Sequence, residues 1–233
     1  MFSRLQFTVA LALLFGYGLV SAHALSSGTP SEGRWHPQHI GTLPNMAVAQ
    51  ISKEWSQCSG REGAIADLII DGCSAVIQAG QDSPNRLATA FNNRGVAHKF
   101  KGENDSALED YNQAILLNPN FANAYNNRGV IYRLKGDYDR AIKNYDEAIW
   151  LDSNIPAFFY NRAIAYSDKE DYGRAIGDFD AVLRFNPKNA LGLYGRGVAR
   201  MKNGDAQNGS ADIAAANALN PNVVQEYEHS GKR

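Results

Sequence analysis

The chain has 233 residues, with 23 basic and 24 acidic side chains and a formal net charge of −1. This balance, together with the lack of a sustained basic run, excludes a polybasic patch for a membrane surface and an electrostatic footprint for nucleic acid. The composition is that of a soluble helical domain, so we expect no nucleic-acid partner.

The N-terminal 24 residues have the features of a secretory signal. Arg4 precedes an apolar run from Leu5 to Val20, and the run gives way to Ser-Ala-His-Ala, an Ala-x-Ala ending suited to signal peptidase. We expect residues 1–24 to be a signal peptide that is cleaved after Ala24, with no membrane insertion of the mature chain. The alternative is an uncleaved anchor, because an apolar run of about 16 residues is near the lower limit for a spanning helix.

Residues 25–52 are rich in Ser, Gly, Pro and Gln and show little hydrophobic periodicity. We therefore expect a flexible linker or arm. His36 and His39 lie close together in this segment, but no third ligand follows at a defined spacing. Two histidines fall short of the donor set of a zinc site, so no metal site is predicted.

Cys58 and Cys73 are the only cysteines of the chain. In an exported protein an even number of cysteines favours a disulfide. The segment from Gly72 to Ile77 has the pattern of residues 110–115 in the repeats described below, so both cysteines fall in a degraded helical hairpin at 53–87 that a bridge would staple. The alternatives are two buried thiols or a redox pair, although a redox pair usually has the spacing Cys-x-x-Cys.

A repeat of 34 residues begins at Ala88. The tripeptide Asn-Arg-Gly stands at 93–95 and 127–129, persists as Asn-Arg-Ala at 161–163, and fades to Gly-Arg-Gly at 195–197. A fixed period of this length is typical of stacked helical hairpins, none of which can bury its apolar face without a neighbour. The period therefore predicts an all-α fold.

Each unit has the pattern helix, turn, helix and stop. With units numbered from Ala88, Ala122, Pro156 and Ala190, position 8 is small and position 24 is a ring in the first three units, as close packing at a helix crossing requires. Position 15 is glycine in three units and Glu170 in the third, at the place where a left-handed residue ends a helix. Proline at position 32 in three units stops the second helix.

This pattern resembles the tetratricopeptide repeat, which keeps small residues at positions 8, 20 and 27, aromatic residues at 4, 11 and 24, and proline at 32. The resemblance implies a right-handed α-solenoid of stacked antiparallel hairpins. After the degraded hairpin at 53–87 we expect repeats at 88–121, 122–155 and 156–189, a divergent capping repeat at 190–222, and a C-terminal tail at 223–233 with one or two helical turns. A departure from the family is that position 7, usually leucine, is arginine in every copy.

The arginine row at position 7 consists of Arg94, Arg128, Arg162 and Arg196. It falls on the packing side of the first helix, opposite position 23, which is aspartate in three units and Asn144 in the unit of Arg128. Because an unpaired interior charge is costly, we expect ion pairs within the hairpins rather than an anion site.

The opposite face of the first helix has an apolar row at position 9, flanked by asparagine or tyrosine at positions 5 and 6. In the family this face lines the concave channel, so the resemblance implies a groove for an extended peptide. A carboxamide can both donate and accept, and tyrosines favour interfaces. The predicted groove residues are Asn92, Asn93, Val96, Asn126, Asn127, Val130, Tyr160, Asn161, Ile164 and Tyr194. The alternative is that these asparagines and valines have structural roles between adjacent hairpins.

No catalytic constellation is present, because the five histidines are dispersed and no serine or cysteine lies in a nucleophile motif. We therefore expect a non-catalytic interaction module without a cofactor, which binds a protein or peptide partner in its groove. The signal and the two cysteines point to the bacterial periplasm. The main alternative is a scaffold that self-assembles through its convex face or its ends, and a more remote one is an enzyme with an unrecognised site.

Overall fold

The computed structural model describes residues 53–60 and 66–232, with side chains as far as His229. These residues belong to one compact unit, Leu43–Arg233. The predicted signal peptide, its cleavage site, the linker and the two histidines within it lie outside the described residues.

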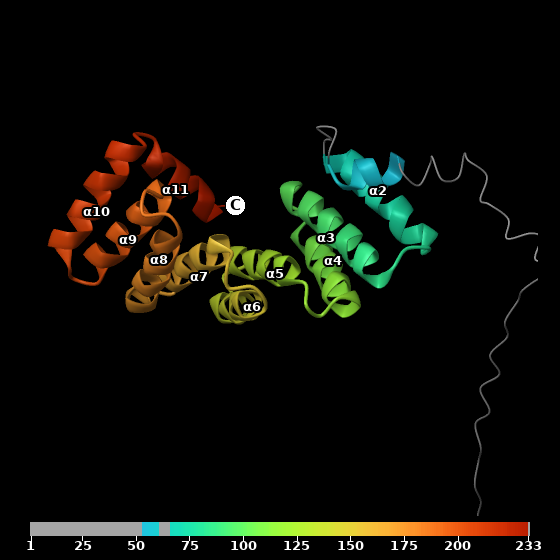
Figure 1. Ribbon diagram of the computed structural model, residues 1–233, viewed down its shortest axis with the longest axis horizontal. Coiled ribbons are helices and arrows are strands. Elements are labelled where there is room, and N and C mark those ends of the chain that lie inside the picture. The colour runs from blue at the N-terminus through green and yellow to red at the C-terminus, as the bar shows by residue number, and fades with distance from the viewer. Residues whose placement is uncertain (1–52, 61–65, 233) are drawn as a thin grey trace, which may run out of the picture. The chain divides into compact units, whose positions relative to one another are not determined.

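The described residues form helices and connecting turns (Figure 1). A helical stretch at 53–58 comes first. The helices that follow are α2 (Ala66–Ala79), α3 (Pro84–Phe100), α4 (Asn104–Leu117), α5 (Ala122–Leu134), α6 (Tyr138–Leu151), α7 (Pro156–Asp168), α8 (Tyr172–Phe185), α9 (Ala190–Lys202), α10 (Ala206–Leu219) and α11 (Val223–Lys232). The predicted all-α fold is confirmed.

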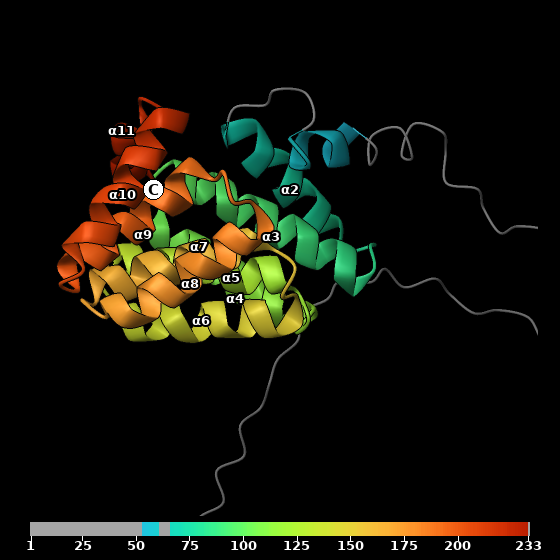
Figure 2. The same ribbon diagram turned by 60° about the vertical axis from the view of Figure 1, so that its left-hand side comes forward.

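Consecutive helices pack as hairpins, and each hairpin packs on the next. The pairs α3 with α4, α5 with α6, α7 with α8 and α9 with α10 make the most extensive contacts. The first helices of successive hairpins, α3, α5, α7 and α9, also contact one another in series. The hairpins therefore stack as an α-solenoid in which the first helices form one layer and the second helices another (Figure 2).

The small residue at position 8 makes room for the ring at position 24. A Cβ atom added to Gly95 would lie 2.7 Å from Cε1 of Tyr111, and one added to Gly129 would lie 2.7 Å from Cε1 of Tyr145. Both tyrosines are completely buried. The pairing of small with large residues thus sets the close crossing of the two helices within a hairpin.

The turns between paired helices use the left-handed residue that the repeat pattern predicts. Gly102, Gly136 and Gly204 have φ angles of 78°, 76° and 92°. Glu170 occupies the equivalent place in the third repeat and has φ 63°, so it adopts the same conformation despite its side chain. The turn geometry is therefore fixed by the packing of the helices around it, and glycine only lowers its cost.

A disulfide joins Cys58 to Cys73 and so fastens the helical stretch 53–58 to α2. Both cysteines are buried together with Val76 and Ala90, and the side chain of Trp55 packs against this cluster. Because Ala90 belongs to α3, the stapled N-terminal segment is packed onto the first complete repeat.

Candidate functional site

Asparagine side chains at positions 5 and 6 form a hydrogen-bonded row across the layer of first helices. We call this row the amide ladder; it consists of Asn93 and Asn92 on α3, Asn127 and Asn126 on α5, and Asn161 on α7. Nδ2 of Asn127 donates to Oδ1 of Asn92 at 2.9 Å, and Nδ2 of Asn161 donates to Oδ1 of Asn126 at 2.8 Å. These two bonds connect neighbouring repeats.

The ladder is continuous and has one direction. Within α3 and within α5 the two neighbouring amides are linked at 3.4 Å, from Nδ2 of Asn92 to Asn93 and from Nδ2 of Asn126 to Asn127. At the N-terminal end, Nδ2 of Asn93 donates to the main-chain carbonyl of Cys58 at 3.2 Å. Each amide thus donates to the next one along the ladder, from the third repeat toward the first. In this alignment neighbouring hydrogen bonds polarise one another.

The ladder therefore has a structural role, which was one of the two interpretations of the sequence. It leaves capacity for a second role, since each carboxamide offers two N–H groups and two acceptor lone pairs, and the ladder uses only part of them. Asn127 and Asn161 remain half-buried, whereas Asn92 and Asn126 are buried. The half-buried amides are those that a partner can reach.

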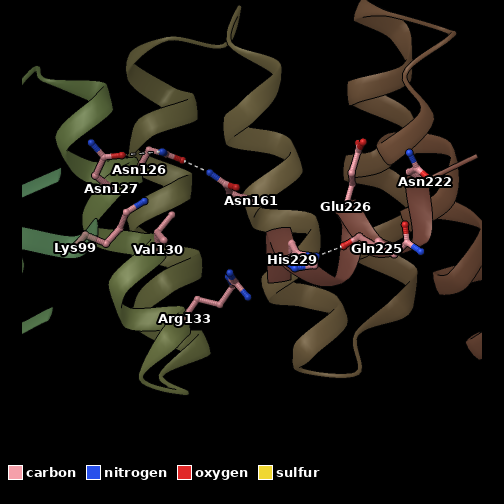
Figure 3. A pocket seen from close by; sticks show the side chains of 10 residues that line it. All are labelled: Lys99, Asn126, Asn127, Val130, Arg133, Asn161, Asn222, Gln225, Glu226 and His229. Atoms are coloured by element: carbon pink, nitrogen blue, oxygen red, sulfur yellow. Dashed lines mark hydrogen bonds between the residues drawn. The ribbon is translucent and has the colours of Figure 1, made fainter. Parts of the chain in front are cut away.

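The ladder lines a groove with a volume of about 780 Å³ (Figure 3). One wall is formed by Asn126, Asn127, Val130 and Arg133 of α5, Asn161 of α7 and Lys99 of α3. The other wall is formed by Asn222 and by Gln225, Glu226 and His229 of α11. Five of these ten side chains are carboxamides, so the groove mostly presents neutral groups that both donate and accept hydrogen bonds.

The charged groups of the groove carry both signs. Arg133 is only 8 % exposed and donates from Nη1 to Oδ2 of Asp168 on α7 at 3.1 Å. Glu226 accepts a hydrogen bond from Nδ2 of Asn220 at 2.9 Å. Lys99 and His229 also line the groove. The groove therefore lacks the concentration of like charge that would select a highly charged ligand.

Beyond the ladder, Tyr227 of α11 packs over the first helices of the last two repeats. Its ring meets that of Tyr194 edge-on, with centroids 5.1 Å apart. Burial raises the pKa of the Tyr227 hydroxyl, and the neighbouring Tyr160 and Asp168 raise it further. Position 6 of the fourth repeat is Gly195, where an added Cβ would lie 2.4 Å from Cζ of Phe179 and 3.0 Å from Cε2 of Tyr227. The ladder residue is absent here because its space is filled by these two rings.

The predicted groove residues therefore divide into three groups. Asn126, Asn127, Val130 and Asn161 line the groove. Asn92 and Asn93 belong to the ladder, and Val96 packs against the cluster around Tyr111. Ile164, Tyr160 and Tyr194 lie away from this groove.

Tertiary packing explains why these three residues lie away from the groove. Ile164 is 5 % exposed within the main core cluster, against which Tyr160 and Tyr227 pack. Tyr160 also meets Phe179 edge-on, with centroids 5.9 Å apart. The tyrosines predicted as anchors for a partner are instead partners of the C-terminal helix.

Sequence reasoning missed the wall formed by α11. The polar residues at 222, 225, 226 and 229 have the spacing of one helical face. That spacing indicates a polar stripe on a helix, but it does not indicate what the stripe faces.

Two features are absent from the described residues. None of the helices there is long and apolar enough to cross a membrane. Within the same residues, no group of three or more His, Cys, Asp or Glu side chains is arranged to hold a metal ion.

Several solved structures are similar to this chain. A crystal structure of MamA protein is 17 % identical, covers 76 % of this chain and 96 % of its own, and has a TM-score of 0.63. MamA from Desulfovibrio magneticus RS-1 is 14 % identical, with coverages of 81 % and 98 % and a TM-score of 0.64. YrrB, described as a TPR protein with an unusual peptide-binding site, is 16 % identical, with coverages of 78 % and 92 % and a TM-score of 0.61. At these identities the likeness concerns the fold.

No curated protein matches the chain in sequence. Family models do match, under the descriptions "Tetratricopeptide repeat" at residues 122–155 and 160–221 and "TPR repeat" at residues 100–134. Together these matches span most of the stacked hairpins, and the matched segment 122–155 has the bounds of the second repeat. From the repeat pattern, the hairpin geometry and these matches, the chain belongs to the tetratricopeptide repeat family.

Proposed function

We propose that this chain is a non-catalytic scaffold of the cell envelope that binds an extended peptide segment of a protein partner in the groove between the amide ladder and α11. Proteins of this family are typically interaction modules. The observation that carries the proposal is the placement of half-buried carboxamides along the wall of an open groove. YrrB, a protein of the same fold, is described as having a peptide-binding site.

The chemistry of the groove suits the main chain of a peptide. An extended segment carries one N–H and one C=O per residue, which lose their hydrogen bonds to water on binding and need replacements. The remaining donors and acceptors of Asn127 and Asn161 can supply these replacements from one wall. Gln225 and Asn222 offer the same groups from the other wall. Such contacts hold a backbone with little dependence on the side chains of the partner.

Photo-crosslinking from within the groove tests this proposal. The photoreactive amino acid benzoylphenylalanine is placed at Gln225, which lines the groove, and in a second variant at Gln207, which is exposed on α10. We expect cross-linking to a partner from position 225 and none to that partner from position 207. Fragment mass spectrometry then shows whether the linked site lies in an extended segment of the partner. Equal cross-linking from both positions would refute the groove as the binding site.

The envelope location has a separate test. We expect the protein isolated from cells to begin at Leu25 and to contain the Cys58 to Cys73 disulfide in non-reducing peptide maps, because an exported chain loses its signal and oxidises. An intact N-terminus with reduced thiols would contradict this location and would leave the groove proposal unaffected.

A further inference from the structure

The arginine row at position 7 is held by paired carboxylates in three of the four repeats. Arg94 donates from Nε and Nη2 to the two carboxylate oxygens of Asp110 at 2.9 and 2.7 Å. Arg162 binds Asp178 in the same way at 2.8 and 2.7 Å. Arg196 binds Asp212, also at 2.8 and 2.7 Å. The ion pairs predicted for these three hairpins are therefore confirmed.

Each of these arginines also reaches the second helix of the preceding unit. Nη1 of Arg162 donates to Asp146 at 2.6 Å, and Nη1 of Arg196 donates to Asp180 at 2.7 Å. Nη1 of Arg94 donates to the hydroxyl of Ser74 at 3.0 Å. The guanidinium of each repeat thus bridges two second helices, with one or two carboxylates beside it.

Arg128 bridges α4 and α6 in the second repeat, and we call the space around its guanidinium the Arg128 cleft. Arg128 has no carboxylate partner among the described residues. Its Nε donates to Oδ1 of Asn144 and its Nη1 to Oδ1 of Asn112, both at 2.8 Å. Two neutral amides thus replace the acids found in the third and fourth repeats. The cleft of the second repeat therefore keeps the full charge of its guanidinium.

The hydrogen bonding of Nη2 shows what this cleft lacks. In the three sister repeats Nη2 donates to the second oxygen of the aspartate at position 23. In Asn144 that place is taken by an amide nitrogen, which instead donates to the carbonyl of Arg140 at 2.8 Å. Nη2 of Arg128 has no acceptor among the described residues. This nitrogen is not one of the buried, unpaired polar atoms of the described residues, so it keeps contact with solvent.

The pKa shifts agree with this difference. Burial lowers the pKa of Arg128, and the nearby Tyr132 and Tyr125 offset this effect only in part. Hydrogen bonds to Asp212 and Asp180 raise the pKa of Arg196, and Asp178 and Asp146 outweigh the effect of burial on Arg162. The charge of Arg128 is thus the one in the row that an added anion would stabilise most.

The surface around this cleft is suited to a protein partner. Asn112, which holds Nη1, is exposed on α4. One helical turn after it stands Leu116, 73 % exposed, and the equivalent residue of α6 is Trp150, 77 % exposed. We call the exposed side of α4 and α6 that carries these three residues the outer patch. Leu116 and Trp150 occupy equivalent positions of successive repeats, and each offers a large apolar side chain that a partner can cover.

We propose that Arg128 and the outer patch form a second docking site, for a protein partner that presents a carboxylate beside an apolar side chain. In the third and fourth repeats Nη2 of the equivalent arginine donates to an aspartate carboxylate, so a carboxylate is the group that satisfies this edge of the guanidinium. A partner's carboxylate would accept from Nη2 and from the remaining N–H of Nη1, and the adjoining apolar side chain would cover Leu116 or Trp150. The site uses no residue of the groove, so its test is independent of the proposed groove function.

The test follows the Nε–Hε signals of the arginines by NMR in the full chain, at constant ionic strength. The probes are two capped dipeptides, acetyl-Glu-Leu-amide and acetyl-Gln-Leu-amide. We expect the glutamate probe to shift the Arg128 signal saturably and to bind about fivefold more tightly than the glutamine probe, as one surface ion pair allows. The Arg162 signal is the internal control and should not move, because its guanidinium already binds two carboxylates.

Asn144→Asp is the matched variant, because three sister repeats carry aspartate at this position and fold with it. We expect the Arg128 signal to move to the position of the Arg162 signal and to lose its response to the glutamate probe. Trp150→Ala should weaken binding of that probe without changing the free Arg128 signal. Equal shifts with both probes, no shift of Arg128, or an undiminished response in Asn144→Asp would overturn the proposal.

Discussion

The first three repeats and the fourth have the same architecture, but their concave faces differ. In the first three, position 6 is asparagine and the amides form a ladder along an open groove. In the fourth, position 6 is Gly195, and the space is filled by Phe179 and Tyr227. The same periodic backbone can therefore present a binding surface or receive a helix of its own chain. The two outcomes differ in the residues at positions 5 and 6, which are Tyr194 and Gly195 in the fourth repeat.

The two ends of the solenoid also differ in how they are closed. At the N-terminal end the disulfide holds the stretch 53–58, and the carbonyl of Cys58 accepts from Asn93 of the ladder. At the C-terminal end α11 covers the last repeat through Tyr227 and the buried Val223. Terminal repeats lack one neighbour, so each end needs a substitute for the missing hairpin.

The largest expected effect comes from removing the closure at the C-terminal end. Tyr227→Ala leaves a cavity between Tyr194 and Phe179, and we expect a loss of about 3 to 4 kcal/mol in the free energy of unfolding. Hydrogen exchange should rise in α11 and α9 before it rises in α3. The measurement is urea denaturation together with exchange, and Glu228→Ala, an exposed neighbour on α11, is the control. A loss no larger than that of the control would show that α11 does not stabilise the fourth repeat.

The second prediction breaks the closure at the N-terminal end. Replacing Cys58 and Cys73 by serine removes a bridge between residues 15 apart, which we expect to cost about 3 kcal/mol because the unfolded chain gains freedom. Exchange should increase in α2 and at Asn93, and α11 should be unaffected. Reduction of the unaltered protein with dithiothreitol provides the control. Equal exposure of α11 would mean that the two ends are not independent.

The third expected effect comes from interrupting the amide ladder, which distinguishes the first three repeats from the fourth. Asn126→Ala removes the acceptor of Asn161 and the donor to Asn127, and we expect a loss of about 2 kcal/mol in the free energy of unfolding because buried amides lose partners. Calorimetric melting provides the measurement. Asn123→Ala is the matched control, since Asn123 is exposed on the same helix. If both variants melted alike, the ladder would have no structural role.

The smallest effect concerns a feature that the two regions share. Asp137 caps α6 and Asp205 caps α10, and the pKa of each carboxyl is lowered by hydrogen bonds, from Arg140 in the first case and Asn208 in the second. A lowered pKa in the folded state contributes stability at neutral pH, and this contribution is lost as the pH falls below about 4. Replacing either aspartate by asparagine should make the free energy of unfolding depend less on pH in the acid range, by a similar small amount for each. Denaturation midpoints at several acid pH values test whether the two regions respond alike.

Local features of the fold could be predicted because each depends on residues close in sequence or one period apart. Gly129 and Tyr145 belong to one hairpin, and their small and large side chains predict the crossing. Arg162 and Asp178 are 16 residues apart in one unit, so the register alone predicts their ion pair. Glu170 takes the turn conformation that the neighbouring repeats assign to glycine.

The missed features depend on residues that share no period. Tyr227 lies outside the repeats, and its contact with Tyr194 could not be obtained from the register. The sequence predicts Tyr160 and Tyr194 as anchors for a partner, and in the structure both pack near Tyr227 of α11. The polar stripe of α11 was likewise visible as a pattern without its location.

The sequence by itself determined the helical hairpins, their stacking order and the asparagines that face one side, and it favoured a bond between the two cysteines. These follow from periodicity, because every repeat solves the same packing problem with the same residue types. Only the tertiary structure decided that the amides bond to one another in one direction and that α11 closes the concave face of the last repeat. It also decided that Arg128 binds a second amide, Asn112, where the third and fourth repeats have an acid. The physical reason is that these depend on contacts between separate repeats and the C-terminal helix, where side-chain geometry rather than sequence spacing selects the partner.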